Sequence, residues 1–252
     1  MSLFIKNKNV LFTFYHIEKC AGTSLRYELY NYFSRFMDKN LIFLPEINKV
    51  GNNINLTNNN ILQITKQGKK FIEFINKKLI FLCHISYNDR IFCFEPMFKI
   101  TCIRHPISRV ISHYNYFDRK NYNNREFDRL TNDELQKWFI QKGNLTIFRL
   151  TCNSDNLLLA KQNLLKMNHV IIVEEYDKDI QVLGYKLEKS FGNKFYHVNL
   201  KKNIGLKSNY KFNKIFLEKI TFYLKEELEL YYFYKNCRRA FKNILGAKFI
   251  KK

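Results

Sequence analysis

Short apolar runs alternate with longer amphipathic stretches along most of the chain. The apolar runs are rich in Val, Ile, Leu and Phe and about five residues long, which is typical of buried β-strands. They are Val10–Tyr15, Leu79–Cys83, Phe98–Ile103 and His169–Val173, and Lys194–Val198 is a candidate for a last strand.

The stretches between these strands show helical spacing of apolar residues or helix start signals. The predicted helices are Ser24–Phe36, Pro106–Phe117, Asn156–Met167, Asp177–Ser190 and the amphipathic tail Phe212–Lys242. This alternation predicts an α/β fold, a three-layer sandwich with a central parallel sheet and helices on both faces. We expect a single domain over residues 1–252, with a polar insertion at 121–144 and a basic helical C-terminal segment from about residue 201.

The charge of the chain is strongly positive, with 43 basic against 22 acidic residues and a formal net charge of +21. An excess of this size points to anionic substrates, nucleic acid or a membrane surface as partners. The richness in Lys, Asn, Ile and Phe also fits an AT-rich genome, so codon bias is an alternative cause of the excess.

Cysteine spacing and hydropathy restrict the class of protein further. The six cysteines are scattered without a C-x-x-C pair, so we expect neither a zinc site nor a dense disulfide framework. No apolar run reaches the roughly 18–20 residues of a membrane span, and charge follows Met1 too soon for a signal peptide. The chain as given is therefore expected to be soluble and intracellular, in the cytoplasm.

The segment after the first predicted strand, His16–Leu25, has the composition of an anion-binding loop. A loop between a strand and a helix presents backbone N–H groups and the positive end of the helix dipole to an anion. Gly22 allows close approach of the backbone, while Lys19 and the hydroxyls of Thr23 and Ser24 add donors. The alternative is that Ser24 is only a helix N-cap. The Walker A pattern of nucleotide kinases is absent from this sequence segment.

His16–Leu25 resembles the 5′-phosphosulfate-binding loop of the carbohydrate sulfotransferases, typically H-[IV]-P-K-[TS]-[AG]-G-T-S. The resemblance is to the heparan sulfate 2-O- and 6-O-sulfotransferases and their bacterial or viral relatives, which have a P-loop NTPase-like fold. It implies that the donor 3′-phosphoadenosine 5′-phosphosulfate (PAPS) contacts the following residues of this chain: Lys19, Cys20, Ala21, Gly22, Thr23 and Ser24. Glu18 stands where proline is usual, and Cys20 where a hydroxyl residue is usual.

A second segment, Thr101–Ser112, resembles the 3′-phosphate motif of the same family, L-R-[DN]-P-[VI]-x-R-x-x-S. Arg104 follows a predicted strand and offers a planar fork to a phosphate, and Ser112 adds a hydroxyl from the following helix. The resemblance implies that these two residues bind the 3′-phosphate. Arg109 has a structural alternative, pairing with an acid in the fold, and His105 replaces the usual acid.

His84 is the candidate general base, because it ends an apolar strand where the family places a Gly-His pair whose histidine takes the acceptor's proton. The alternative is an ordinary strand-end histidine. Lys19 is expected to stabilise the leaving 5′-phosphate as PAP forms. Lys201 and Lys202 stand where the family has a basic loop over the nucleotide, and they are either 3′-phosphate ligands or solvated. No metal is required.

The sequence does not identify the acceptor, although the positive charge fits an anionic glycan. Two rival functions remain at this point. One is a P-loop kinase on a similar fold, and the other is a basic nucleic-acid-binding protein without catalysis, although no specific nucleic acid is expected. A family member that binds nucleotide without catalysis is a third alternative, suggested by Glu18, Cys83 and His105.

Overall fold

The computed structural model describes residues 10–44, 77–84, 86–87, 95–197, 212 and 214–249. The backbone divides into two compact units, each built from two stretches of the chain. The first unit comprises Met1–Ile103 and Met167–Leu206, and the second comprises Arg104–Lys166 and Lys207–Lys252. The single domain expected for residues 1–252 stays a prediction.

The first unit is built on a five-stranded parallel sheet with the strand order β2-β3-β1-β4-β5. Its strands are β1 (Phe12–Tyr15), β2 (Ile42–Phe43), β3 (Ile80–Cys83), β4 (Phe98–Ile103) and β5 (His169–Ile172). Almost every strand residue is buried, which explains why the strands appear in the sequence as continuous apolar runs. The sheet is flanked by helices, and this confirms the predicted α/β fold with a parallel sheet.

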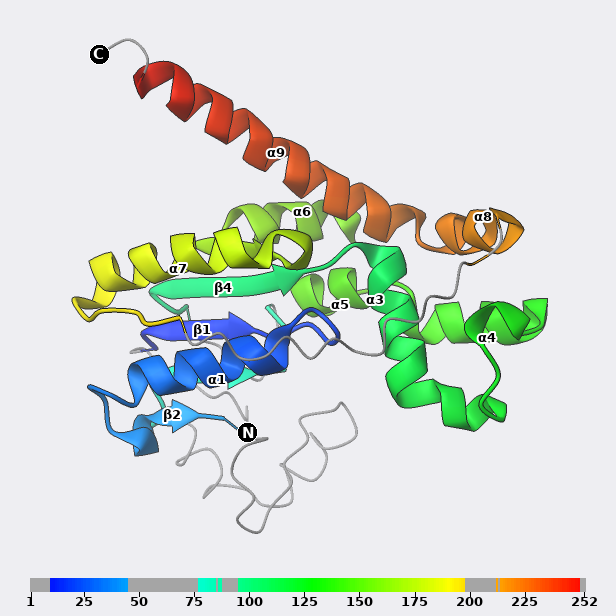
Figure 1. Cartoon of the computed structure of the whole chain (residues 1–252), viewed down its shortest axis with the longest axis horizontal. Helices are drawn as coiled ribbons and strands as arrows, with labels where there is room; N and C mark the ends of the chain where they lie inside the picture. Colours follow the sequence, from blue (N-terminus) through cyan, green and yellow to red (C-terminus); the bar gives the residue numbers. More distant parts are fainter. Residues whose placement is uncertain are drawn as a thin grey trace, which may run out of the picture. The chain divides into compact units, whose positions relative to one another are not determined.

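Helix α1 (Gly22–Phe33) packs against β3 and helix α7 (Tyr176–Phe191) against β5, and both run along the strands in Figure 1. The hydroxyl of Tyr32 in α1 donates to the carbonyl of Leu187 in α7 at 3.2 Å. Phe12 of β1 contacts the rings of Phe33 and Phe191, with centroid distances of 4.9 and 6.4 Å. These aromatic rings form the core between the sheet and the two helices, with edge and tilted geometries that such rings prefer.

The second unit is helical. It contains α3 (Pro106–His113), α4 (Asn132–Lys142), α5 (Leu145–Thr151), α6 (Leu157–Leu165), α8 (Lys214–Tyr223) and α9 (Lys225–Phe249). Between α3 and α4 lie a π-helical turn, Tyr114–Asp118, and two 3₁₀ turns, Arg119–Tyr122 and Phe127–Arg129; in the first unit, 3₁₀ turns occupy Lys39–Leu41 and Val173–Glu175. Helix α9 contacts α3, α5, α6 and α8.

The polar segment 121–144 differs from the insertion that the sequence predicts. Trp138 and Phe139 of α4 are buried in an apolar cluster with Phe127, and the indole nitrogen of Trp138 donates to Asp118 at 2.9 Å. Thr131 and Glu134 form a capping box at the start of α4, which satisfies N–H groups that a helix end leaves without partners. The segment therefore builds part of the core of the second unit.

Two other predicted elements have different bounds in the structure. Residues 194–197 form no strand, and Val198 lies outside the described residues. The predicted tail helix is divided at Leu224 into α8 and α9. In the described part of the chain, no helix combines the length and the apolar character that crossing a bilayer requires.

Candidate active site

The strand order reverses at β1, because β3 and β2 lie on one side of it and β4 and β5 on the other. Ligands of open α/β sheets bind outside the carboxyl ends of the strands at such a reversal. Tyr15, the last residue of β1, is paired with Cys83 and with Thr101. The hydroxyl of Thr101 also donates to the carbonyl of Tyr15 at 2.8 Å. The residues that follow β1 and β3 are therefore brought to one edge of the sheet.

The loop after β1 is folded around the ring of His16. This ring is almost fully buried, at 4% exposure, and it occupies the space beside Gly22. A Cβ atom at position 22 would lie 1.8 Å from the Cδ2 and Nε2 atoms of His16. A side chain at position 22 would therefore displace the His16 ring, since no rearrangement of a few tenths of an ångström relieves a contact that short.

Helix α1 begins at Gly22, two residues before the predicted start, so Ser24 lies in its first turn and is not its N-cap. The N-cap is Ala21, and no side chain caps the helix. The N–H groups of a first turn have no partner within their helix, and their end of the dipole is positive. Thr23 is exposed and Ser24 half-buried. This arrangement suits an anion.

Lys19 and Ala21 both have positive φ angles, 63° and 56°. Non-glycine residues adopt this left-handed conformation at a cost of order 1–3 kcal/mol, and such residues cluster at ligand-binding sites. The half-buried Lys19 belongs to the same turn as the uncapped helix start. Its cation is thus part of a tight loop whose backbone conformation the surrounding structure imposes.

His84, the residue after β3, lies against His16. The two imidazole rings are stacked with a centroid distance of 3.8 Å, and the Nδ1 atom of His84 lies 3.0 Å from the carbonyl oxygen of His16. Because a carbonyl oxygen only accepts, Nδ1 of His84 is the donor, and a neutral ring then has its lone pair on Nε2. The arrangement gives His84 the tautomer that a general base of the Nε2 type needs.

The carboxylate of Glu18 is the third group beside His84. Its Oε1 atom lies 3.8 Å from Nδ1 of His84, and the two side chains are 18% and 23% exposed. In the sequence, Glu18 stands out only because similar loops have proline at this position. The contact with His84 is therefore a feature of the site that the sequence did not reveal.

The comparison with protein families agrees with this geometry. Residues 1–156, more than half of the chain, match the model of the sulfotransferase family. The chain belongs to the sulfotransferase family. Membership implies an enzyme that uses PAPS as sulfuryl donor. No curated protein matches the chain at a significant level. The matched segment contains the loop after β1, His84 and the second motif of the sulfotransferase.

The second motif contains two arginines in different environments. Arg109 of α3 is fully buried, and its Nη2 atom lies 3.7 Å from Oε2 of Glu227 in α9; this nitrogen also donates to the carbonyl of Gly143. The structural alternative for Arg109 is thus confirmed. Arg104 and Ser112 are half-buried, and their contacts with the 3′-phosphate of PAPS stay predictions.

Glu227 completes this buried pair. Its Oε1 atom accepts from the backbone N–H groups of Thr146 and Ile147 at 2.6 and 3.0 Å, at the start of α5. The carboxylate thus has two charge-assisted hydrogen bonds as well as a cation beside it. The pair connects α3, α5 and α9 within the second unit.

The remaining predicted donor ligands differ in accessibility. Cys20 is fully buried, and its N–H donates to the carbonyl of Ile17 at 3.3 Å, so its contact with the donor stays a prediction. Ala21 is half-buried. Lys201 and Lys202 lie outside the described residues.

Within the described ranges, no group of three or more His, Cys, Asp or Glu side chains is placed to hold a metal ion. Metal-free transfer stays a prediction.

Three further histidines have structural partners. His105 contacts the hydroxyl of Tyr232 through Nε2 at 3.2 Å, and Nε2 of His169 contacts the carbonyl of Asp179 at 2.9 Å. His197 lies 3.1 Å from the carboxylate of Glu28. Burial raises the pKa of this Glu28 carboxyl, although the interaction with His197 opposes the shift.

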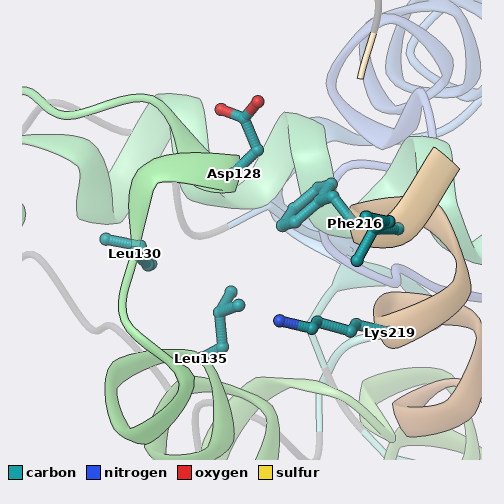
Figure 2. A pocket seen from close by; sticks show the side chains of 6 residues that line it. Asp128, Leu130, Leu135, Phe216 and Lys219 are labelled. Carbon is teal, nitrogen blue, oxygen red and sulfur yellow. The ribbon is translucent and has the colours of Figure 1, made fainter. Parts of the chain in front are cut away.

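The second unit contains a small pocket that is lined by other residues than those of the predicted site. It is lined by Asp128, Leu130, Leu135, Ile215, Phe216 and Lys219 (Figure 2). Four of its six lining residues are apolar, and Asp128 and Lys219 add one charge of each sign. None of the predicted site residues lines it.

The first prediction concerns Gly22. Gly22→Ala forces the His16 ring out of its position, and we expect a loss of about 1–3 kcal/mol in the free energy of unfolding together with a smaller thermal shift on adding PAP. Ala21→Gly is the matched control, because it relieves a left-handed residue in the same loop and changes stability by less than about 1 kcal/mol. Urea denaturation and thermal shift measure both variants. Equal stability of Gly22→Ala and the parent protein would contradict the steric argument.

The second prediction concerns the buried pair. Arg109→Met leaves the Glu227 carboxylate buried without its cation, and we expect a loss of about 3–5 kcal/mol in the free energy of unfolding. Arg129→Met, which removes an exposed arginine, should change the same quantity by less than about 0.5 kcal/mol. Similar urea midpoints for the two variants would show that the Arg109 pair contributes little.

Proposed function

We propose that this sulfotransferase moves the sulfuryl group of PAPS to a hydroxyl group of an anionic glycan, with His84 as general base. The observation that supports the base is the contact of its Nδ1 atom with the carbonyl of His16, 3.0 Å away, which leaves the lone pair of the neutral ring on Nε2. The resemblance to the heparan sulfate 2-O- and 6-O-sulfotransferases supports the glycan.

The loop after β1 fits the 5′-phosphosulfate of the donor. Gly22 has no side chain to hinder the backbone, and the first turn of α1 offers uncapped N–H groups, to which Thr23 and Ser24 add hydroxyl donors. Backbone donors of this kind stabilise charge that develops on the transferred group. Lys19 provides the cation.

Arg104 and Ser112 retain the role that the second motif assigns to them, binding of the 3′-phosphate. A guanidinium group offers two parallel N–H donors to a phosphate. This phosphate distinguishes PAPS and PAP from AMP and ATP, so these two residues account for nucleotide specificity. Lys201 and Lys202 are proposed as further ligands of the same phosphate on sequence grounds alone.

The reaction is an in-line displacement at sulfur. The acceptor oxygen forms a bond to sulfur while the bond between sulfur and the 5′-phosphate oxygen breaks, and that oxygen leaves with the electron pair as part of PAP. The proton of the acceptor hydroxyl passes to Nε2 of His84, which later returns it to solvent. The ammonium group of Lys19 stabilises the negative charge on the leaving oxygen.

The positive charge of the chain supports an anionic acceptor. A net charge of +21 raises the local concentration of a polyanion and its rate of association, and it does so more at low ionic strength. Sulfated or uronic-acid-containing glycans are the corresponding acceptor class.

The third prediction tests the donor. PAP should raise the melting temperature of the protein far more than AMP or ATP at equal concentration, because only PAP has the 3′-phosphate that Arg104 and Ser112 are proposed to bind. Thermal shift measures the three ligands side by side. Arg104→Ala should remove most of the difference between PAP and AMP. Equal shifts for the three nucleotides would contradict the donor assignment, and a shift with ATP alone would favour a kinase.

The fourth prediction tests the base. His84→Ala should lower turnover of labelled PAPS by about 10²–10⁴-fold while leaving the PAP thermal shift nearly intact. His84→Asn is the matched variant, because its amide can still donate to the carbonyl of His16 but offers no basic nitrogen. Both variants should lose turnover to a similar extent across a panel of glycan acceptors. Full activity of His84→Asn would remove His84 from the proton transfer.

A further inference from the structure

The carboxylate of Glu18 lies beside the ring nitrogen of His84 that faces away from the proposed chemistry. Its Oε1 atom is 3.8 Å from Nδ1 of His84, and the same Nδ1 is 3.0 Å from the carbonyl of His16. The Glu18 carboxylate, the His16 carbonyl and the stacked His16 imidazole all lie against the His84 ring. Among these three groups, Glu18 alone has an acidic side chain.

The position of this carboxylate matters most during proton transfer. When a base of the His84 type takes a proton on Nε2, its ring becomes a cation, and a carboxylate about 4 Å away stabilises that cation more strongly where water is partly excluded. Both side chains are mostly buried, at 18% and 23% exposure. The His16 carbonyl holds the tautomer, whereas the full negative charge comes from Glu18.

We propose that Glu18 is a positioning residue that acts through His84, forming a Glu–His pair that stabilises the imidazolium ring during sulfuryl transfer. The inference rests on the proposed function, in which His84 is the base. Similar loops have proline at this position, which cannot act in this way. The departure at position 18 thus adds a group to the site of this chain.

The pair also explains why Glu18 is compatible with an anion-binding loop. A carboxylate next to a bound phosphosulfate would weaken binding by repulsion, because like charges at close range oppose each other. The carboxylate of Glu18 instead lies beside the Nδ1–H group of His84. Its negative charge is therefore used at the proton acceptor rather than at the donor nucleotide.

The test is a double-mutant cycle on labelled-PAPS turnover with the full chain. Glu18→Gln should lower kcat by about 10- to 100-fold, with the KM for PAPS and the PAP thermal shift changed less than twofold. Glu18→Asp, which restores a carboxylate, should recover part of the loss. In the His84→Asn background, Glu18→Gln should change the residual turnover less than twofold, because a residue that acts through His84 has no effect without it.

Asp177→Asn is the control, since it removes one negative charge from an exposed position of α7 and should leave kcat unchanged. An unchanged kcat of Glu18→Gln overturns the pair while leaving the proposed function intact. A parallel loss in PAP binding shows that Glu18 only shapes the loop and also overturns it, as does an equal loss in both backgrounds. Absence of turnover in the unmodified protein overturns the proposed function itself, and this role with it.

Discussion

The ring of His16 occupies the space that a side chain at position 22 would need, and the arrangement of the site depends on this packing. The ring is buried and stacked on His84, so moving it away from position 22 would disturb this packing. The loop turns tightly through two left-handed residues, Lys19 and Ala21, before α1 begins. The helix start and the second imidazole both lie against a histidine for which no chemical step is proposed.

The same packing determines the orientation of His84. Its ring is stacked on His16, and its Nδ1 atom donates to the His16 backbone carbonyl. A backbone carbonyl holds the ring of a base in one orientation, because the carbonyl has no alternative rotamer and no protonation state of its own. β1 and β3 are paired up to their last residues, Tyr15 and Cys83. His16 and His84, the residues that follow Tyr15 and Cys83, therefore leave the sheet side by side.

The sequence predicted four of the five strands because a parallel sheet buries both faces of its strands, which then appear as apolar runs. It did not predict β2, which is only two residues long, or the aromatic core around Trp138, where polar residues in between conceal the apolar positions. The strand expected at 194–198 did not form in its described part. The aromatic and apolar residues there resemble a strand, whereas His197 contacts the carboxylate of Glu28 in α1.

The candidate site was predictable only as far as its chemistry is local. Lys19, Gly22 and Ser24 are neighbours in the sequence, so their spacing alone indicated an anion-binding loop. The partner of Arg109 is different, since Glu227 is distant in the sequence and no local pattern identifies it. The contact between Glu18 and His84 also depends on the sheet order, which places the end of β3 beside the end of β1.

Glu18 and Cys20, the two residues at which the loop departs from similar sequences, lie in different environments. These environments argue against a loop that has lost its function. Cys20 is fully buried near Cys102, and burial raises the pKa of the Cys102 thiol well above its usual value. A neutral thiol packs as a small apolar group, whereas a hydroxyl buried there would need an acceptor. Glu18 lies beside His84 instead. Neither residue replaces Lys19 or the Gly-Thr-Ser segment, so the groups that we propose to bind the anion are retained.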